Sequence, residues 1–305
     1  MRFTLLFALS FLIYLPSAFA YTRLPIWPSK VVSGTNTVTD FSKDPAVKNR
    51  AVTNVESPEI IHVPPVGKSN QSAILIIPGG GYSYIMEDSE GLNVAEFLAK
   101  KGYTCFVLLY RMPKGGSDAR RTEAFADVQR AMRVIRSMAS QYKIATNKIG
   151  VMGFSAGGYL AANISNNPDA NNYSATDGHD RASARPDFTV LMYSVLSMKD
   201  GITHNGSRSA LYGNNLSDSN KQRYSQDAMV TAKTPPTFIV HALNDSTVVA
   251  QGSLAMFEAL RKNKVLVEMH LFQSGTHGFG IAQNRELSVR NWPNLFSDWQ
   301  SFLGK

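Results

Sequence analysis

The stretch KIGVMGFSAGG, residues 148–158, decides the predicted fold. Lys148–Gly153 is an apolar run of strand length, and Ala156–Ser165 has the composition of a helix, so a strand leads into a helix at Ser155. The pentapeptide GFSAG at this junction matches G-x-S-x-G. In that motif a sharp turn lifts the serine hydroxyl above the sheet, and only small neighbours avoid a collision. The context therefore predicts that Ser155 is a nucleophile.

Short apolar runs alternate with amphipathic stretches on both sides of this turn. The alternation predicts an α/β fold with a parallel sheet flanked by helices, in one domain over residues 21–305 and without an internal repeat. Strands are expected at 72–77, 104–110, 148–153, 188–195, 237–242 and 266–272, and helices at 91–101, 119–142, 156–165, 253–263 and 292–303.

Three segments depart from this rhythm. Tyr21 to about Pro65 is a weakly patterned arm, and Asn166–Pro186 and Ser197–Pro236 are polar excursions from the sheet. Long loops in a compact domain are often functional, so the two excursions either shape a substrate site or are tolerated surface insertions.

A nucleophilic serine needs a base to take its proton and an acid to orient that base. Asp245 follows the expected strand 237–242, and His277 lies in a glycine-flanked loop after the last strand. The chain order Ser, Asp, His is the order that this kind of sheet imposes, so we predict the triad Ser155, Asp245 and His277. For Asp245 the alternative is a turn-forming role. The other histidines are weaker candidates for the base. His241 and His270 lie in expected strands and are predicted to be structural. His62 precedes the expected sheet, and His179 and His204 lie in polar loops.

The segment Pro78–Tyr82, PGGGY, ends the expected strand 72–77 and offers backbone N–H groups that no side chain obstructs. We expect Gly80 and Gly81, with Ala156, to bind the oxyanion, and Tyr82 to contact substrate. These glycines lack the third glycine of a dinucleotide fingerprint, and the chain has neither an H-E-x-x-H motif nor a second cysteine. No cofactor and no metal are therefore expected.

The 305 residues are 44% hydrophobic and 18% charged, a globular composition that excludes a disordered chain. Because Cys105 is the single cysteine, a disulfide scaffold is excluded too, and a buried strand position is expected for it. The net charge of +8 arises within residues 100–150. This basic segment is either a solvated helix face or attracts an acidic polymer. Nucleic acid is not an expected partner, because no binding motif accompanies the charge.

Residues 1–20 have the pattern of a secretory signal peptide: a basic start, the apolar run Leu5–Leu15 and the ending Ala18-Phe19-Ala20. We expect cleavage after Ala20 and export to the periplasm or the medium. The apolar run falls short of the about 20 residues that a spanning helix needs, so no stable membrane association is expected. The oligomeric state stays open.

Several blocks in sequence order resemble the α/β-hydrolase superfamily, and within it bacterial acetylxylan esterases, pectin acetylesterases and feruloyl-esterase-like proteins. The blocks are PGGGY at 78–82, YRMP at 110–113, DVQRAMRVIR at 127–136, KIGVMGFSAGG at 148–158, ARPDF at 184–188, PPTFIVHALND at 235–245 and GTHGFG at 275–280. One departure is Pro78, where many related esterases carry histidine.

This resemblance implies an α/β-hydrolase fold and a serine carboxylesterase that removes short acyl groups, commonly acetyl, from plant cell-wall polysaccharides or oligosaccharides such as pectin or xylan. The basic segment favours polyanionic pectin if its charges border the cleft. Two alternatives remain. One is a prolyl-oligopeptidase-like peptidase, which usually carries a gating domain that this chain has no room for. The other is a non-catalytic binding protein on the same fold, which retention of all three triad residue types disfavours.

Overall fold

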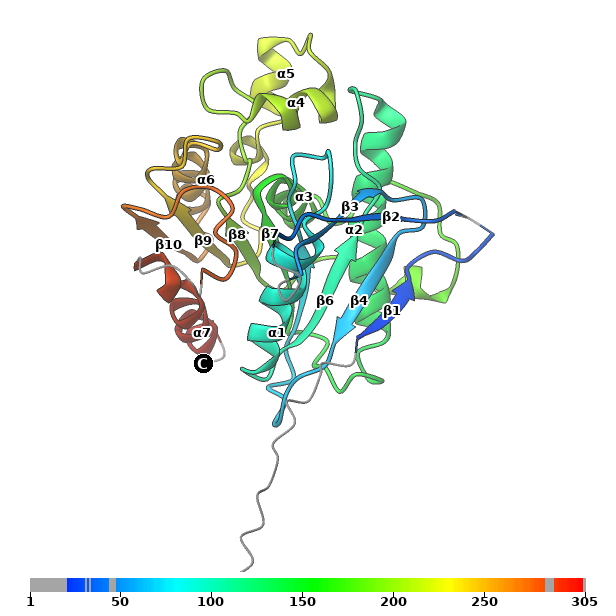
Figure 1. The fold of residues 1–305 in the computed structure, drawn as a ribbon. Coiled ribbons are helices and arrows are strands. Elements are labelled where there is room, and N and C mark those ends of the chain that lie inside the picture. Colours follow the sequence, from blue (N-terminus) through cyan, green and yellow to red (C-terminus); the bar gives the residue numbers. More distant parts are fainter. Residues whose placement is uncertain (1–20, 31, 33, 44–47, 283–287, 304–305) are drawn as a thin grey trace, which may run out of the picture.

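The computed structural model describes residues 21–303 except 31, 33, 44–47 and 283–287 (Figure 1). The predicted signal peptide, residues 1–20, lies outside the described residues.

Within the described part of the chain, one sheet contains eight strands in the order β1-β4-β6-β5-β7-β8-β9-β10. The six strands from β6 to β10 in this order are parallel, whereas β4 runs antiparallel to β6 and β1 runs antiparallel to β4. Their bounds are β1 Thr22–Pro25, β4 Glu59–Val63, β5 Ala73–Ile77, β6 Thr104–Leu109, β7 Ile149–Phe154, β8 Thr189–Met192, β9 Thr237–Ala242 and β10 Val267–Phe272.

The inner strands are covered on both faces, which explains why they appear in the sequence as continuous apolar runs. Every residue of β5, β6, β7 and β9 is buried. Cys105 lies in β6 and is buried, as expected. The mostly parallel sheet flanked by helices confirms the predicted fold class.

The helices divide between the two faces of the sheet. Helix α1 connects β5 to β6, and α2 connects β6 to β7, which lies on the other side of β5. The two connections therefore run in opposite directions across the sheet. Because both crossovers are right-handed, they place α1 and α2 on opposite faces. Helix α7 lies with α1, since Lys101 donates a hydrogen bond to Asn294, and α3 contacts α2 (Figure 1). No helix among the described residues has the length and apolar character needed to cross a membrane. The helices are α1 Asn93–Ala99, α2 Asp118–Ser137, α3 Ser155–Asn166, α4 Asn205–Tyr212, α5 Asp218–Arg223, α6 Gln251–Lys262 and α7 Trp292–Leu303.

The prediction of a weakly patterned arm up to Pro65 is wrong, because four strands lie within it. Two of them, β1 and β4, extend the main sheet by antiparallel pairing, and His62 therefore lies inside the sheet rather than before it. The other two, β2 (Thr37–Asp40) and β3 (Arg50–Asn54), form a separate two-stranded sheet. Strands of four or five residues show too few alternations to be recognised by their period.

Two element ends differ from expectation by three residues or more. The strand expected to reach residue 195 ends at Met192, because Tyr193 has a φ of 36° and leaves the extended conformation. Helix α2 ends at Ser137 rather than at residue 142, with Met138 as its C-cap.

The polar excursion 197–236 contains α4, α5 and a 3₁₀ turn at Gln226–Met229. Helices α4 and α5 lie beyond the carboxyl ends of the parallel strands, at the top of Figure 1. In an open parallel sheet this edge is where ligands bind.

Candidate active site

Ser155 occupies the sharp turn between β7 and α3. Its φ of 49° lies in the left-handed region, a strained conformation for a serine, and its side chain is nearly buried. A Cβ on Gly157 would come within 2.2 Å of the Ile77 carbonyl oxygen, and one on Gly153 within 2.6 Å of the Ala161 Cβ. The glycines of the motif are therefore required by the space between the turn, β5 and α3.

Ser155, His277 and Asp245 form a continuous hydrogen-bonded chain. The Ser155 Oγ lies 2.8 Å from His277 Nε2, and His277 Nδ1 lies 2.7 Å from Asp245 Oδ2. A carboxylate only accepts, so Nδ1 carries the proton and Nε2 is left to accept the serine proton. The structure thus brings together three side chains that come from the ends of β7, β9 and β10. This arrangement can activate the serine hydroxyl as a nucleophile.

Asp245 is buried and held by several donors. Its Oδ1 accepts the N–H groups of Thr247 and Val248, each at 2.9 Å. His241 Nε2 donates to the Val248 carbonyl and lies 3.4 Å from Asp245 Oδ2. Burial acts to raise the pKa of the Asp245 carboxyl, but hydrogen bonds from His241, His277 and the Val248 N–H outweigh burial and hold that pKa well below its usual range. The carboxylate therefore stays charged beside His277.

The loop that carries His277 is fixed by Asn244, the neighbour of Asp245. The Asn244 Oδ1 accepts the N–H groups of Gly275 and Thr276, each at 3.0 Å. No role for Asn244 was predicted from the sequence. Its role could have been predicted from its position directly before Asp245, because a side-chain amide there lies within reach of the His277 loop at the same sheet edge.

The glycine loop after β5 lies beside the serine turn, because Ile77 and Gly153 are register partners in neighbouring strands. Gly80 and Gly81 have φ values of 128° and 63°, and a Cβ on Gly80 would meet the Tyr84 carbonyl oxygen at 2.0 Å. The N–H of Ala156 lies in the first turn of α3, where no intrahelical acceptor exists. Gly80 and Gly81 line the same cavity as Ser155. These three backbone groups are thus placed near the serine, and their role in oxyanion binding stays a prediction.

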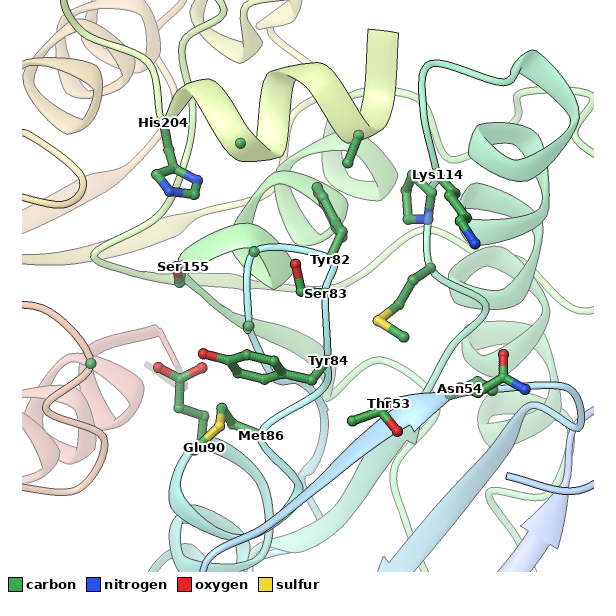
Figure 2. A pocket seen from close by; sticks show the side chains of 18 of the residues that line it. Thr53, Asn54, Tyr82, Ser83, Tyr84, Met86, Glu90, Lys114, Ser155 and His204 are labelled. Atoms are coloured by element: carbon green, nitrogen blue, oxygen red, sulfur yellow. The ribbon is translucent and has the colours of Figure 1, made fainter. Parts of the chain in front are cut away.

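Glu90 is a residue that the sequence analysis missed. It lies in a π-helical turn, Glu87–Leu92, is 4% exposed and lines the cavity below Ser155 (Figure 2). Its Oε2 accepts the Gly79 N–H at 2.7 Å, and its Oε1 accepts the Tyr193 hydroxyl at 2.9 Å. Burial raises the pKa of Glu90, against the hydrogen bonds from Gly79 and Tyr193. Glu90 thus fastens the glycine loop to the end of β8.

Tyr82 lines the cavity, but its hydroxyl donates to the Ala156 carbonyl at 2.8 Å and the residue is only 5% exposed. The hydroxyl is therefore engaged with α3 rather than available to a ligand. The Tyr82 hydroxyl thus links the glycine loop to the serine turn by a hydrogen bond. Contact of the Tyr82 ring with substrate stays a prediction.

The cavity that contains Ser155 and His277 has a volume of about 760 Å³. Its walls come from β3, the glycine loop, the loop after β6 and the start of α4 (Figure 2). The arm and the excursion 197–236 therefore both contribute to it, through Thr53 and His204 among others. The excursion 166–186 does not line this cavity; its Asp177 pairs instead with Arg130 of α2.

The basic segment 100–150 is largely neutralised by ion pairs. Arg111 lies 2.6 Å from Asp127, Arg130 pairs with Asp177 and Asp180, and Arg136 pairs with Asp187. Of the segment's eleven basic residues, the two that line the cavity are Lys114 and Arg120. Most of the charge thus holds the fold together rather than facing the cavity.

The described residues contain no group of three or more His, Cys, Asp or Glu side chains arranged to hold a metal ion. His241 is buried and bonded on both ring nitrogens, which confirms its structural placement. His204, expected in a polar loop, instead caps α4 and lines the cavity.

Comparison with known proteins finds a matching family model and curated relatives. The family model described as BD-FAE matches residues 60–260. An acetylxylan esterase of Xylanibacter ruminicola is 34% identical over 213 residues, which is 68% of this chain and 41% of that protein. An endo-1,4-beta-xylanase B of Butyrivibrio fibrisolvens is 33% identical over 72% of this chain and 34% of its own length. The chain thus spans less than half the length of these curated relatives.

Solved structures agree with the fold. The acetyl ester-xyloside bifunctional hydrolase of Caldicellulosiruptor lactoaceticus superposes with a TM-score of 0.77 at 33% identity, covering 93% of this chain and 96% of that one. A carboxylesterase of Lactobacillus plantarum superposes with a TM-score of 0.66 at 20% identity, over 89% and 98% of the two chains, and supports the fold alone.

Proposed function

The chain belongs to the BD-FAE family of α/β-hydrolases, and from this premise we propose that it is a serine carboxylesterase that removes acetyl groups from xylan or its oligosaccharides. The observation that carries the proposal is the hydrogen-bonded chain from Ser155 through His277 to Asp245, which opens into a cavity large enough for sugar residues.

In the first half of the proposed reaction, the Ser155 Oγ attacks the ester carbonyl carbon while its proton passes to His277 Nε2. The carbonyl oxygen becomes an oxyanion beside the N–H groups of Gly80, Gly81 and Ala156. The tetrahedral intermediate then expels the sugar oxygen, which takes the proton from His277 and leaves as a free hydroxyl. The acyl group remains on Ser155.

In the second half, a water molecule gives a proton to His277 Nε2 as its oxygen attacks the acyl carbon. The second intermediate collapses with return of that proton to the Ser155 Oγ, and the acid is released. Asp245 stays ionised throughout, consistent with its depressed pKa, and stabilises the imidazolium that forms in each half. In these two steps every bond and proton is accounted for without a cofactor.

We propose xylan rather than pectin as the substrate for two reasons. The similar proteins include an acetylxylan esterase and an acetyl ester-xyloside hydrolase. In addition, six arginines of the basic segment are engaged in ion pairs, and Arg120 at the cavity wall is one of them, paired with Glu123. The attraction expected for a polyanion at this wall therefore rests mainly on Lys114.

The test is acetate release by the purified chain from acetylated xylo-oligosaccharides and acetylated pectin oligosaccharides side by side, with the Ser155→Ala variant as blank. The proposal predicts faster release from the xylo-oligosaccharides and none from the variant. Faster release from pectin would correct the polysaccharide while keeping the chemistry, and wild-type rates equal to the blank on both substrates would refute the esterase.

We further propose that the protein is exported to the periplasm or the medium after cleavage following Ala20. The support is the pattern of residues 1–20. Amino-terminal sequencing of the protein recovered from its native host is expected to begin at Tyr21, and a start at Met1 would contradict export by this route.

A further inference from the structure

His204 is the histidine at the cavity wall that the proposed mechanism does not use. It is the N-cap of α4 and is half-buried, and at the start of that helix its ring points to the side where Ser155 lies (Figure 2). A Cβ placed on Gly81 would lie 3.6 Å from the His204 Cε1. The imidazole therefore stands beside the glycine loop, close to where the ester is proposed to react.

The capping interaction determines which ring nitrogen carries the proton. The backbone N–H of Ser207 donates to His204 Nδ1 at 3.2 Å, and the Ser207 hydroxyl lies 2.9 Å from the same nitrogen. A backbone N–H can only donate, so Nδ1 accepts and the proton of the neutral ring resides on Nε2. The cap thus makes Nε2 a hydrogen-bond donor.

The structure gives this Nε2–H no protein acceptor among the described residues. The ring also stays neutral: burial lowers the pKa of His204, and the neighbouring His277 lowers it further, against the opposing charge of Asp245. A neutral donor with a set direction, exposed to a cavity of this size, is suited to an uncharged oxygen acceptor.

We propose that His204 is a substrate-binding residue whose Nε2–H donates to an oxygen of the sugar that carries the acetyl group. This assignment rests on the proposed esterase function. Three backbone donors, those of Gly80, Gly81 and Ala156, are already proposed for the oxyanion, whereas no partner has been proposed for the sugar hydroxyls. Helix α4 belongs to the excursion 197–236, so this segment would supply sugar specificity to a reaction carried out at the sheet edge.

Two substitutions separate the donor from the cap. In His204→Asn the amide oxygen can still accept the Ser207 N–H, because asparagine is among the best N-cap residues, but the side chain is too short to place a donor where Nε2 lies. In His204→Gln the longer amide can again present an N–H in the cavity. Ser209→Ala is the matched control, since Ser209 lies on the same helix and bonds Asn214 without lining the cavity.

The experiment measures kcat/KM on acetylated xylo-oligosaccharides and on 4-nitrophenyl acetate, which has no sugar oxygen. Leaving a substrate hydroxyl unpaired costs about 10- to 100-fold, so we expect that loss for His204→Asn on the sugar ester only, with nitrophenyl acetate unchanged within about twofold. His204→Gln is expected to recover part of the loss, and Ser209→Ala to match the wild type on both substrates.

An equal loss on both substrates would overturn the sugar assignment, because it would place the donor at the oxyanion or in the scaffold. No loss on either substrate would overturn it as well. These outcomes leave the wild-type esterase intact. A wild type that is inactive on the acetylated xylo-oligosaccharides contradicts the proposed function, and the His204 assignment falls with it.

Discussion

The Glu90 carboxylate accepts the backbone N–H of Gly79 at 2.7 Å, and this bond joins a buried acid to the loop that carries the predicted oxyanion donors. The same carboxylate holds the Tyr193 hydroxyl, which in turn accepts the Gly280 N–H at 2.9 Å. Glu90 therefore links three chain segments at the sheet edge: the loops after β5 and β10 and the end of β8.

Replacing Glu90 by alanine is expected to lower kcat by about 100-fold with little change in KM, because a released glycine loop misplaces its N–H groups and one lost oxyanion donor costs that much. Glu90→Gln keeps an acceptor oxygen for Gly79 and should lose less. Glu87→Gln is the control: this buried acid of the same turn pairs with Arg23 and Arg50 rather than with the Gly79 N–H. Steady-state kinetics decide, and equal kcat losses for Glu87→Gln and Glu90→Ala would contradict the positioning role.

Removal of the predicted nucleophile or base should abolish turnover. Ser155→Ala and His277→Ala are each expected to lower kcat by about a million-fold, as in comparable triads, because the first removes the attacking oxygen and the second removes the base that takes its proton. The double variant should be no slower than either single one. Rates on 4-nitrophenyl acetate, with circular dichroism to confirm folding, provide the measurement. Activity within tenfold of wild type in folded Ser155→Ala would remove this residue from the mechanism.

Asp245→Asn tests the orientation of the imidazole. An amide at this position can donate to Nδ1 and so stabilise the wrong tautomer, and kcat is expected to fall about ten-thousand-fold while the fold persists. His241 stays bonded to the Val248 carbonyl in this variant, so the turn after β9 has a second support. A drop of less than tenfold would show that Asp245 serves the turn alone, the alternative that its position after a strand left open.

His62 makes stability depend on pH. Burial lowers its pKa from 6.5 to about 4, where it packs in β4 against Phe106 and Tyr142. Between these two values the unfolded chain binds a proton that the folded chain refuses, so the free energy of unfolding falls as the pH falls through this window. The effect is on the order of 2 kcal/mol, less than the full shift because the ring is partly exposed.

The measurement compares wild type with His62→Gln by urea unfolding at pH 7 and pH 4. The difference in the free energy of unfolding between the wild type and the variant should be about 2 kcal/mol smaller at pH 4 than at pH 7. An advantage that is the same at both pH values would mean that His62 titrates alike in the folded and unfolded chain.

The parallel sheet and its edge were predictable because both have strong local signals. Strand 237–242 and helix 292–303 have the bounds that the sequence predicts, since a buried run or an amphipathic period marks each end. Ser155 is marked by the small residues that its turn requires, and those glycines have no room for a Cβ.

Residues whose position depends on tertiary contacts were not predictable in this way. Glu90 is one of three acids in a short polar run, and nothing local distinguishes the one that meets Gly79 from those that meet arginines. His204 lies in a polar segment, and only the packing of α4 brings it to the cavity. Strand β4 gains its stability from pairing with β6, and β1 from pairing with β4, which their short apolar patterns do not reveal.

The most direct test of the central claim is covalent labelling of the purified protein with a fluorophosphonate, followed by peptide mass spectrometry. A nucleophilic Ser155 predicts one phosphonyl group per chain, on Ser155, with esterase activity lost in proportion to labelling and no label on the Ser155→Ala variant. An unmodified Ser155 peptide in a protein whose esterase activity the reagent has abolished would contradict it.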